Sequence, residues 1–133
     1  MDEDRLRGVC QEYGIELVVL FGSRATGHAR EGSDYDVGVL RQEGIIPAED
    51  FLKLAYRLSQ VLGMGNVDLV DLRRASPLLK YEATRAAQVL YEARPAAFNI
   101  FRVLAWKQYQ DARHDIYRLL PVYIEDSLEV LLS

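Results

Sequence analysis

The sequence predicts an α/β fold, in which a small mixed sheet of about four strands has flanking helices and is followed by a helical C-terminal extension. Helix and strand patterns alternate up to about Ala93, and from Pro95 onward the pattern is helical only. The 133 residues provide enough chain for one hydrophobic core. We therefore expect a single domain over 1–133, with its core at about 15–92 and a helical appendage at about 95–133.

The composition is that of an ordinary globular protein and argues against several classes. Hydrophobic residues make up 50% of the chain, but no apolar run is long enough to span a bilayer, so no membrane association is expected. The formal net charge of −4 disfavours direct nucleic-acid binding, which needs a basic surface. The charged start of the chain lacks the apolar segment of a signal peptide, and Cys10 is the only cysteine. A cytoplasmic location is therefore expected.

The first half of the chain is expected to form a helix, a strand, a turn and a second strand. The helix covers 2–13 and is ended by Gly14. Its apolar face consists of Leu6, Val9, Cys10 and Tyr13. The stretch IELVVLFG predicts a strand at 15–22, SRATGHA a short helical turn at 23–29, and DYDVGVL a second strand at 34–40.

The second half begins with the strongest helical pattern of the chain, over 47–63. A proline opens this helix, acidic residues fill its first turn, and a glycine ends it. Its apolar face consists of Phe51, Leu54, Leu58, Val61 and Leu62. A third strand (NVDLVDL, 66–72), a helix from 77 to about 87 and a short fourth strand (QVLYEA, 88–93) follow.

Two acids, Asp34 and Asp36, stand in the second predicted strand, where carboxylates are costly. Strand alternation places both side chains on the same face, close together. The apolar residues Val37 and Val39 indicate that this strand is largely buried. Two like charges in such a place need a cation, and oxygen ligands at this spacing suit Mg²⁺, which binds through one or two carboxylates plus substrate phosphates.

The residues that end the first strand favour phosphate binding. Gly22 and Ser23 lie where a strand ends and a helical turn begins, so backbone N–H groups there point outward. Gly22 allows close approach of the backbone, and the Ser23 hydroxyl and the Arg24 guanidinium add donors. Together with the acids, these residues predict a nucleoside triphosphate site with metal-assisted phosphoryl chemistry.

The third strand offers a further carboxylate. Asp68 lies near its start, where an adjacent strand would bring it beside the acid pair. A third acid can complete a second metal site and accept the proton of an attacking hydroxyl. Asp71 points to the opposite face of the strand, so both acids cannot serve, and we favour Asp68.

These residues carry a resemblance to a known family. Gly22-Ser23, ten intervening residues and Asp34-Tyr35-Asp36 resemble the G-S-x10-D-x-D signature of the DNA polymerase β-like nucleotidyltransferase superfamily. The small size, LFGSRATG, and VDLVDL followed by SPLLKYEATRAAQVLYE are similar to minimal nucleotidyltransferases, the antitoxins of HEPN–MNT toxin–antitoxin pairs. The likeness covers roughly Ile15 to Glu92.

The resemblance implies a polymerase β-like core and a set of roles. Asp34, Asp36 and Asp68 become the catalytic acids and the ligands of Mg²⁺, with two ions expected. Gly22, Ser23 and Arg24 hold the triphosphate of ATP. The family transfers AMP from ATP to a hydroxyl, and in these antitoxins the acceptor is a tyrosine of the HEPN ribonuclease toxin, with which a hetero-oligomer is expected. Two alternatives stay open: a non-catalytic antitoxin that acts by occlusion, and nucleotide transfer to a small hydroxylated molecule.

The helical C-terminal region carries no motif of its own. It begins at Pro95, and an interruption is expected near Pro121. It is rich in aromatic residues, namely Phe98, Phe101, Trp106, Tyr109, Tyr117 and Tyr123. Such residues suit either a partner interface or packing on the sheet, and the pattern does not decide between the two.

Overall fold

The computed structural model describes residues 2–22 and 34–132, and side chains as far as residue 114. Within these ranges helices and strands follow in the order α1 (Glu3–Tyr13), β1 (Ile15–Phe21), β2 (Tyr35–Arg41), α3 (Ala48–Leu62), β3 (Val67–Asp71), α4 (Pro77–Arg85), β4 (Gln88–Glu92) and α5 (Ala97–Leu132). The predicted α/β order is confirmed for all of these elements. The helical turn expected at 23–29 lies outside the described residues.

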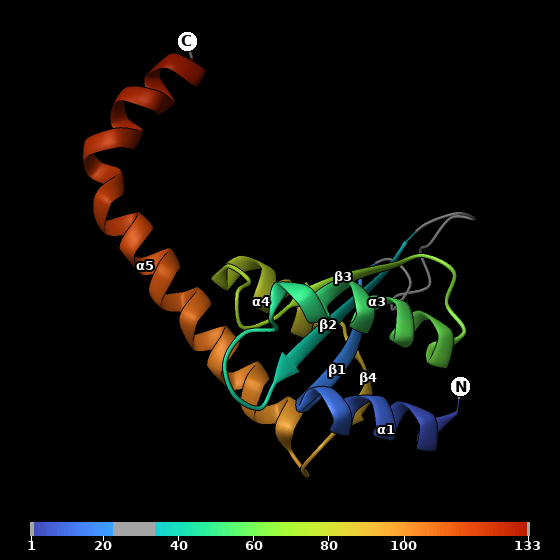
Figure 1. The fold of residues 1–133 in the computed structure, drawn as a ribbon. Helices are drawn as coiled ribbons and strands as arrows, with labels where there is room; N and C mark the ends of the chain where they lie inside the picture. Colours follow the sequence, from blue (N-terminus) through green and yellow to red (C-terminus); the bar gives the residue numbers. More distant parts are fainter. Residues whose placement is uncertain (1, 23–33, 133) are drawn as a thin grey trace.

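The four described strands form one mixed sheet in the order β3-β2-β1-β4. Strand β1 pairs antiparallel with both β2 and β4, whereas β2 and β3 are parallel. Helices α1 and α3 pack on one face of the sheet, and α4 with the first part of α5 packs on the other (Figure 1). Strand β1 is buried along its whole length because both of its faces are covered.

Local capping residues mark the ends of α1 and α3. The Asp2 side chain accepts hydrogen bonds from the backbone N–H groups of Asp4 (3.1 Å) and Arg5 (3.2 Å), which opens α1. Gly63 closes α3 with a φ of 66°, a left-handed conformation that favours glycine. These caps set the length of the two helices that cover one face of the sheet.

Helix α5 differs from the expectation in one respect. It runs without a break from Ala97 to Leu132, so the interruption expected near Pro121 is wrong. Proline removes one N–H donor, but the φ that its ring imposes is compatible with a helix. The last part of α5 extends away from the sheet (Figure 1). Within the described residues, no helix is long and apolar enough to cross a membrane.

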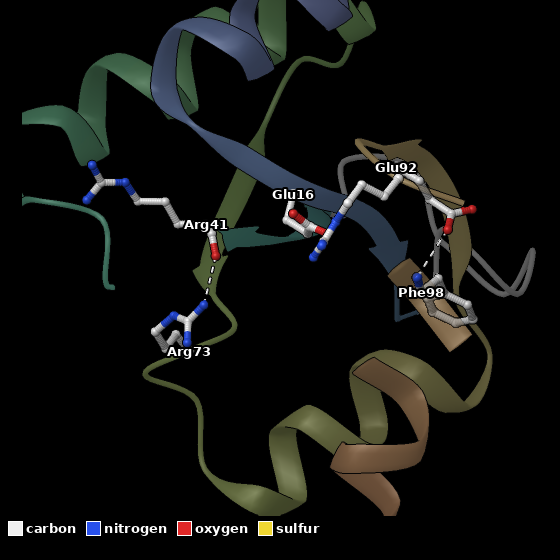
Figure 2. A network of polar contacts seen from close by, with 6 residues as sticks. Glu16, Arg41, Arg73, Glu92 and Phe98 are labelled. Atoms are coloured by element: carbon white, nitrogen blue, oxygen red, sulfur yellow. Dashed lines mark hydrogen bonds and ion pairs between the residues drawn. The ribbon is translucent and has the colours of Figure 1, made fainter. Parts of the chain in front are cut away.

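Polar contacts attach the start of α5 to the sheet (Figure 2). The buried Glu16 of β1 accepts a 2.8 Å hydrogen bond from Arg94, which lies just before α5. The carboxylate of Glu92 accepts a 3.1 Å bond from the backbone N–H of Phe98 in the first turn of α5. Two aromatic residues of α5 also contact the rest of the molecule: Phe101 is buried, and the partly buried ring of Tyr109 stacks on that of Tyr81 with centroids 4.3 Å apart. Packing within the molecule is therefore confirmed for Phe101 and Tyr109, whereas Trp106 is 54% exposed. The side chains of Tyr117 and Tyr123 lie outside the described residues.

Candidate functional site

Strands β2 and β3 bring two of the predicted acids together. The parallel register pairs Asp36 directly with Asp68, and paired residues on neighbouring strands lie on the same face of a sheet about 4.8 Å apart. Asp34 lies one residue before β2 and is exposed, like Asp68, whereas Asp36 is half-buried. The structure therefore gathers these carboxylates where β2 and β3 begin.

The acids interact electrostatically. The pKa of Asp36 is raised above its usual value, first because burial disfavours the charged form, and then because the charges of Asp68 and Asp34 repel it. A cation bound between these carboxylates would relieve that repulsion. Among the described residues, no group of three or more His, Cys, Asp or Glu side chains is placed so that it could hold a metal ion by itself. An ion here would therefore need further oxygen ligands from a substrate.

Gly22 lies against the acid site from the other side. It follows β1, whose last residue, Phe21, pairs with Asp36. Its φ is 75°, and a Cβ atom added to it would lie 2.3 Å from Oδ2 of Asp36. Only glycine therefore brings the backbone this close to the carboxylate. Ser23 and Arg24, the other two predicted phosphate-binding residues, lie outside the described residues.

Asp71 has a different environment from Asp68. Its side chain is buried and accepts hydrogen bonds from the backbone N–H groups of Ile46 (2.8 Å) and Arg73 (3.1 Å). These bonds join the end of β3 to the segment that precedes α3. Asp71 thus serves the fold, and Asp68 is the acid of β3 that lies beside Asp36.

A hollow of about 580 Å³ adjoins the acids at the β3 edge. Its lining consists of Asp34, Ala55, Tyr56, Ser59, Gly65, Asn66, Val67 and Asp68. The sequence reasoning did not single out Tyr56, Ser59 or Asn66. One signal could have found Tyr56, because it is an aromatic residue on the solvent-facing side of an amphipathic helix and is 66% exposed.

Comparison with known proteins identifies the family to which this fold belongs. The family model described as polymerase beta, nucleotidyltransferase matches residues 4–96. This range includes every described strand and all three of the clustered acids. The chain belongs to the polymerase β-like nucleotidyltransferase family, as the sequence resemblance implied.

Two curated relatives and one solved structure are similar to the chain. The protein adenylyltransferase MntA of Aphanizomenon flos-aquae is 31% identical over 96 residues, which cover 66% of this chain and 64% of that protein. The protein adenylyltransferase MntA of Shewanella oneidensis is 34% identical over 77 residues, 58% of this chain and 54% of that protein. The chain thus matches less than two thirds of the length of either relative. A crystal structure of a toxin–antitoxin with AMP-PNP contains a chain with a TM-score of 0.73 and 25% identity, and the match covers 93% of this chain and 99% of that one.

Proposed function

We propose that this protein is a Mg²⁺-dependent protein adenylyltransferase that transfers AMP from ATP to a tyrosine hydroxyl of a HEPN-family toxin, and so acts as its antitoxin. The observation that carries the proposal is the register that pairs Asp36 with Asp68 beside Gly22, in a chain of the nucleotidyltransferase family. The similarity to two MntA adenylyltransferases supports the chemistry. The similarity to a toxin–antitoxin chain crystallised with AMP-PNP supports the nucleotide and the antitoxin role.

The acids are suited to hold magnesium. Carboxylate oxygens are the donors that Mg²⁺ prefers. The pKa of Asp36 is raised by burial and then by repulsion from Asp68 and Asp34, and a bound cation would offset both effects. We assign Asp34 and Asp36 as ligands, with Asp68 completing a site for two ions. When bound, Mg²⁺ neutralises charge that develops on the phosphate oxygens during transfer.

The remaining roles follow from the reaction. The acceptor hydroxyl oxygen forms a bond to the α-phosphorus of ATP, the bond from that phosphorus to the bridging oxygen of the β-phosphate breaks, and pyrophosphate leaves. The hydroxyl proton passes to Asp68. Gly22, Ser23 and Arg24 receive the triphosphate. We place the reaction in the cytoplasm, where ATP is available and the lone Cys10 stays reduced.

Co-expression with the HEPN partner tests the proposal. Intact mass spectrometry should find the toxin heavier by one or more AMP units, and its ribonuclease activity should be lost. With the double variant Asp34→Asn/Asp36→Asn, the toxin should keep its unmodified mass.

Two results would overturn the assignment. A toxin that is neutralised at unchanged mass would establish occlusion without catalysis. An unmodified and active toxin, together with AMP transfer to a small hydroxylated molecule, would establish the other acceptor class.

A further inference from the structure

We propose that the hollow at the β3 edge receives the partner segment that carries the acceptor hydroxyl, and that Tyr56 and Asn66 position it. The inference rests on the proposed function and specifies from which side the acceptor reaches the acids. It also assigns a role to α3, which contributes no acid to the site.

The order of the strands defines two sides of the site. Strand β2, which carries Asp36, lies between β1 and β3. Gly22, the proposed phosphate-binding residue, follows β1 and touches Asp36 from that side. Asp68 lies on β3, at the opposite side of Asp36. Strand β3 is an edge of the described sheet, so no further strand covers this side.

The geometry of phosphoryl transfer assigns one side to each reactant. The attacking and leaving oxygens lie roughly in line, on opposite sides of the phosphorus. If the triphosphate lies toward Gly22, the pyrophosphate leaves on the β1 side. The acceptor hydroxyl must then arrive from the β3 side, past Asp68, which is the acid proposed to take its proton.

The hollow lies on that side and has suitable chemistry. Its volume of about 580 Å³ is sufficient for several side chains of a docked segment. Asp34 and Asp68 line the part next to the reaction, and Tyr56 and Asn66 line the part formed by α3 and the turn before β3. An exposed tyrosine offers a large contact area at low entropic cost, and aromatic residues are enriched where proteins bind proteins. The polar lining fits a peptide segment better than it fits a purine base, which usually occupies a mainly apolar pocket.

The same helix supplies matched controls. Tyr56 also lines a second hollow, of about 410 Å³, between α1 and α3. Gln60, one turn after Tyr56, lines only this second hollow, so Gln60→Ala controls for its loss. Leu52 lies one turn before Tyr56, is 77% exposed and lines neither hollow. Variants at these two positions alter the same exposed surface of α3 without altering the hollow beside the acids.

Steady-state kinetics with purified HEPN toxin and ATP separate the roles of the two substrates. Tyr56→Ala and Asn66→Ala should each raise the KM for the toxin by about tenfold, the effect of truncating an interface anchor, while kcat and the KM for ATP change by less than about twofold. Gln60→Ala and Leu52→Ala should behave like the wild type. An unchanged KM for the toxin in both test variants would overturn the inference. If these variants raise the KM for ATP and leave the KM for the toxin unchanged, the hollow binds the nucleotide and not the toxin.

A crosslinking experiment gives an answer that does not depend on turnover. Cys10 is buried, so Tyr56→Cys supplies the single accessible thiol, to which a benzophenone maleimide can be attached. Irradiation with the toxin should crosslink a toxin peptide that contains a tyrosine, whereas the same label on Gln88→Cys, on β4 at the opposite edge of the sheet, should not capture that peptide. Equal capture from both positions would overturn the inference. If the label at position 56 captures the toxin peptide but the wild type transfers no AMP, the docking site stands and only the proposed function is overturned.

Discussion

At the scale of single residues, the charge of Asp36 opposes folding, because the side chain is partly buried and is repelled by Asp68 and Asp34. Below its ordinary pKa of 3.8, Asp36 is protonated in both the folded and the unfolded chain, and its charge costs nothing. As the pH rises through that value and then through the raised pKa of the folded state, ionisation destabilises the fold. Asp36→Asn should therefore unfold at a higher temperature than the wild type at about pH 7 and at nearly the same temperature at about pH 3. Melting curves followed by circular dichroism at both pH values would measure this, and an equal difference at both would contradict it.

Gly22 is a second single position where a substitution can be tested, because two separate effects disfavour a side chain there. Its positive φ costs an alanine roughly 1–2 kcal/mol, and the added Cβ would displace the carboxylate of Asp36. Gly44 has a similar φ of 70° but nothing within 4 Å of an added Cβ. We expect both Gly22→Ala and Gly44→Ala to lower the free energy of unfolding in urea titrations, Gly22→Ala by at least as much as Gly44→Ala, whereas only Gly22→Ala loses AMP transfer. Retained transfer in Gly22→Ala would mean that the close approach to Asp36 is not needed.

At the scale of elements, β3 presents one acid to each face of the sheet, and the two should respond differently to substitution. Asp71→Ala leaves the N–H groups of Ile46 and Arg73 without their acceptor, so it should lower the free energy of unfolding by about 1–3 kcal/mol. Asp68→Asn should not lower that free energy, because Asp68 is exposed and its charge only repels Asp36, but it should reduce the turnover of AMP transfer by roughly 10²–10⁴. Urea titrations and single-turnover assays measure the two quantities. A catalytic loss in Asp71→Asn without one in Asp68→Asn would reverse the assignment.

At the scale of the whole molecule, Cys10 reports the integrity of the core between α1, α3 and the sheet. Its side chain is fully buried, and burial raises the pKa of its thiol to about 12. At about pH 8 the folded protein should therefore react with a disulfide reagent such as dithionitrobenzoate orders of magnitude more slowly than the protein in urea. Labelling at the rate of the unfolded chain under native conditions would show that this core opens easily.

Local patterns were sufficient for most elements. The two-residue repeat of a strand determines which side chains share a face, so the separation of Asp68 from Asp71 followed from their spacing alone. The C-terminal ends of α1 and α3 were predictable because capping residues such as Gly14 and Gly63 act within one turn. Proline was less informative, since Pro121 lies inside α5 and does not end it.

The sequence by itself determined the family, the alternation of helices and strands, and the acids Asp34, Asp36 and Asp68 as candidates for one site. Only the tertiary structure decided that Asp36 pairs with Asp68 in register, that Gly22 touches Asp36, and that Tyr56 of α3 lines a hollow beside them. The physical reason is the separation along the chain of the residues that interact. Strand faces and helix caps depend on neighbours a few residues away, whereas register depends on how both faces of the sheet pack against helices distant in the chain.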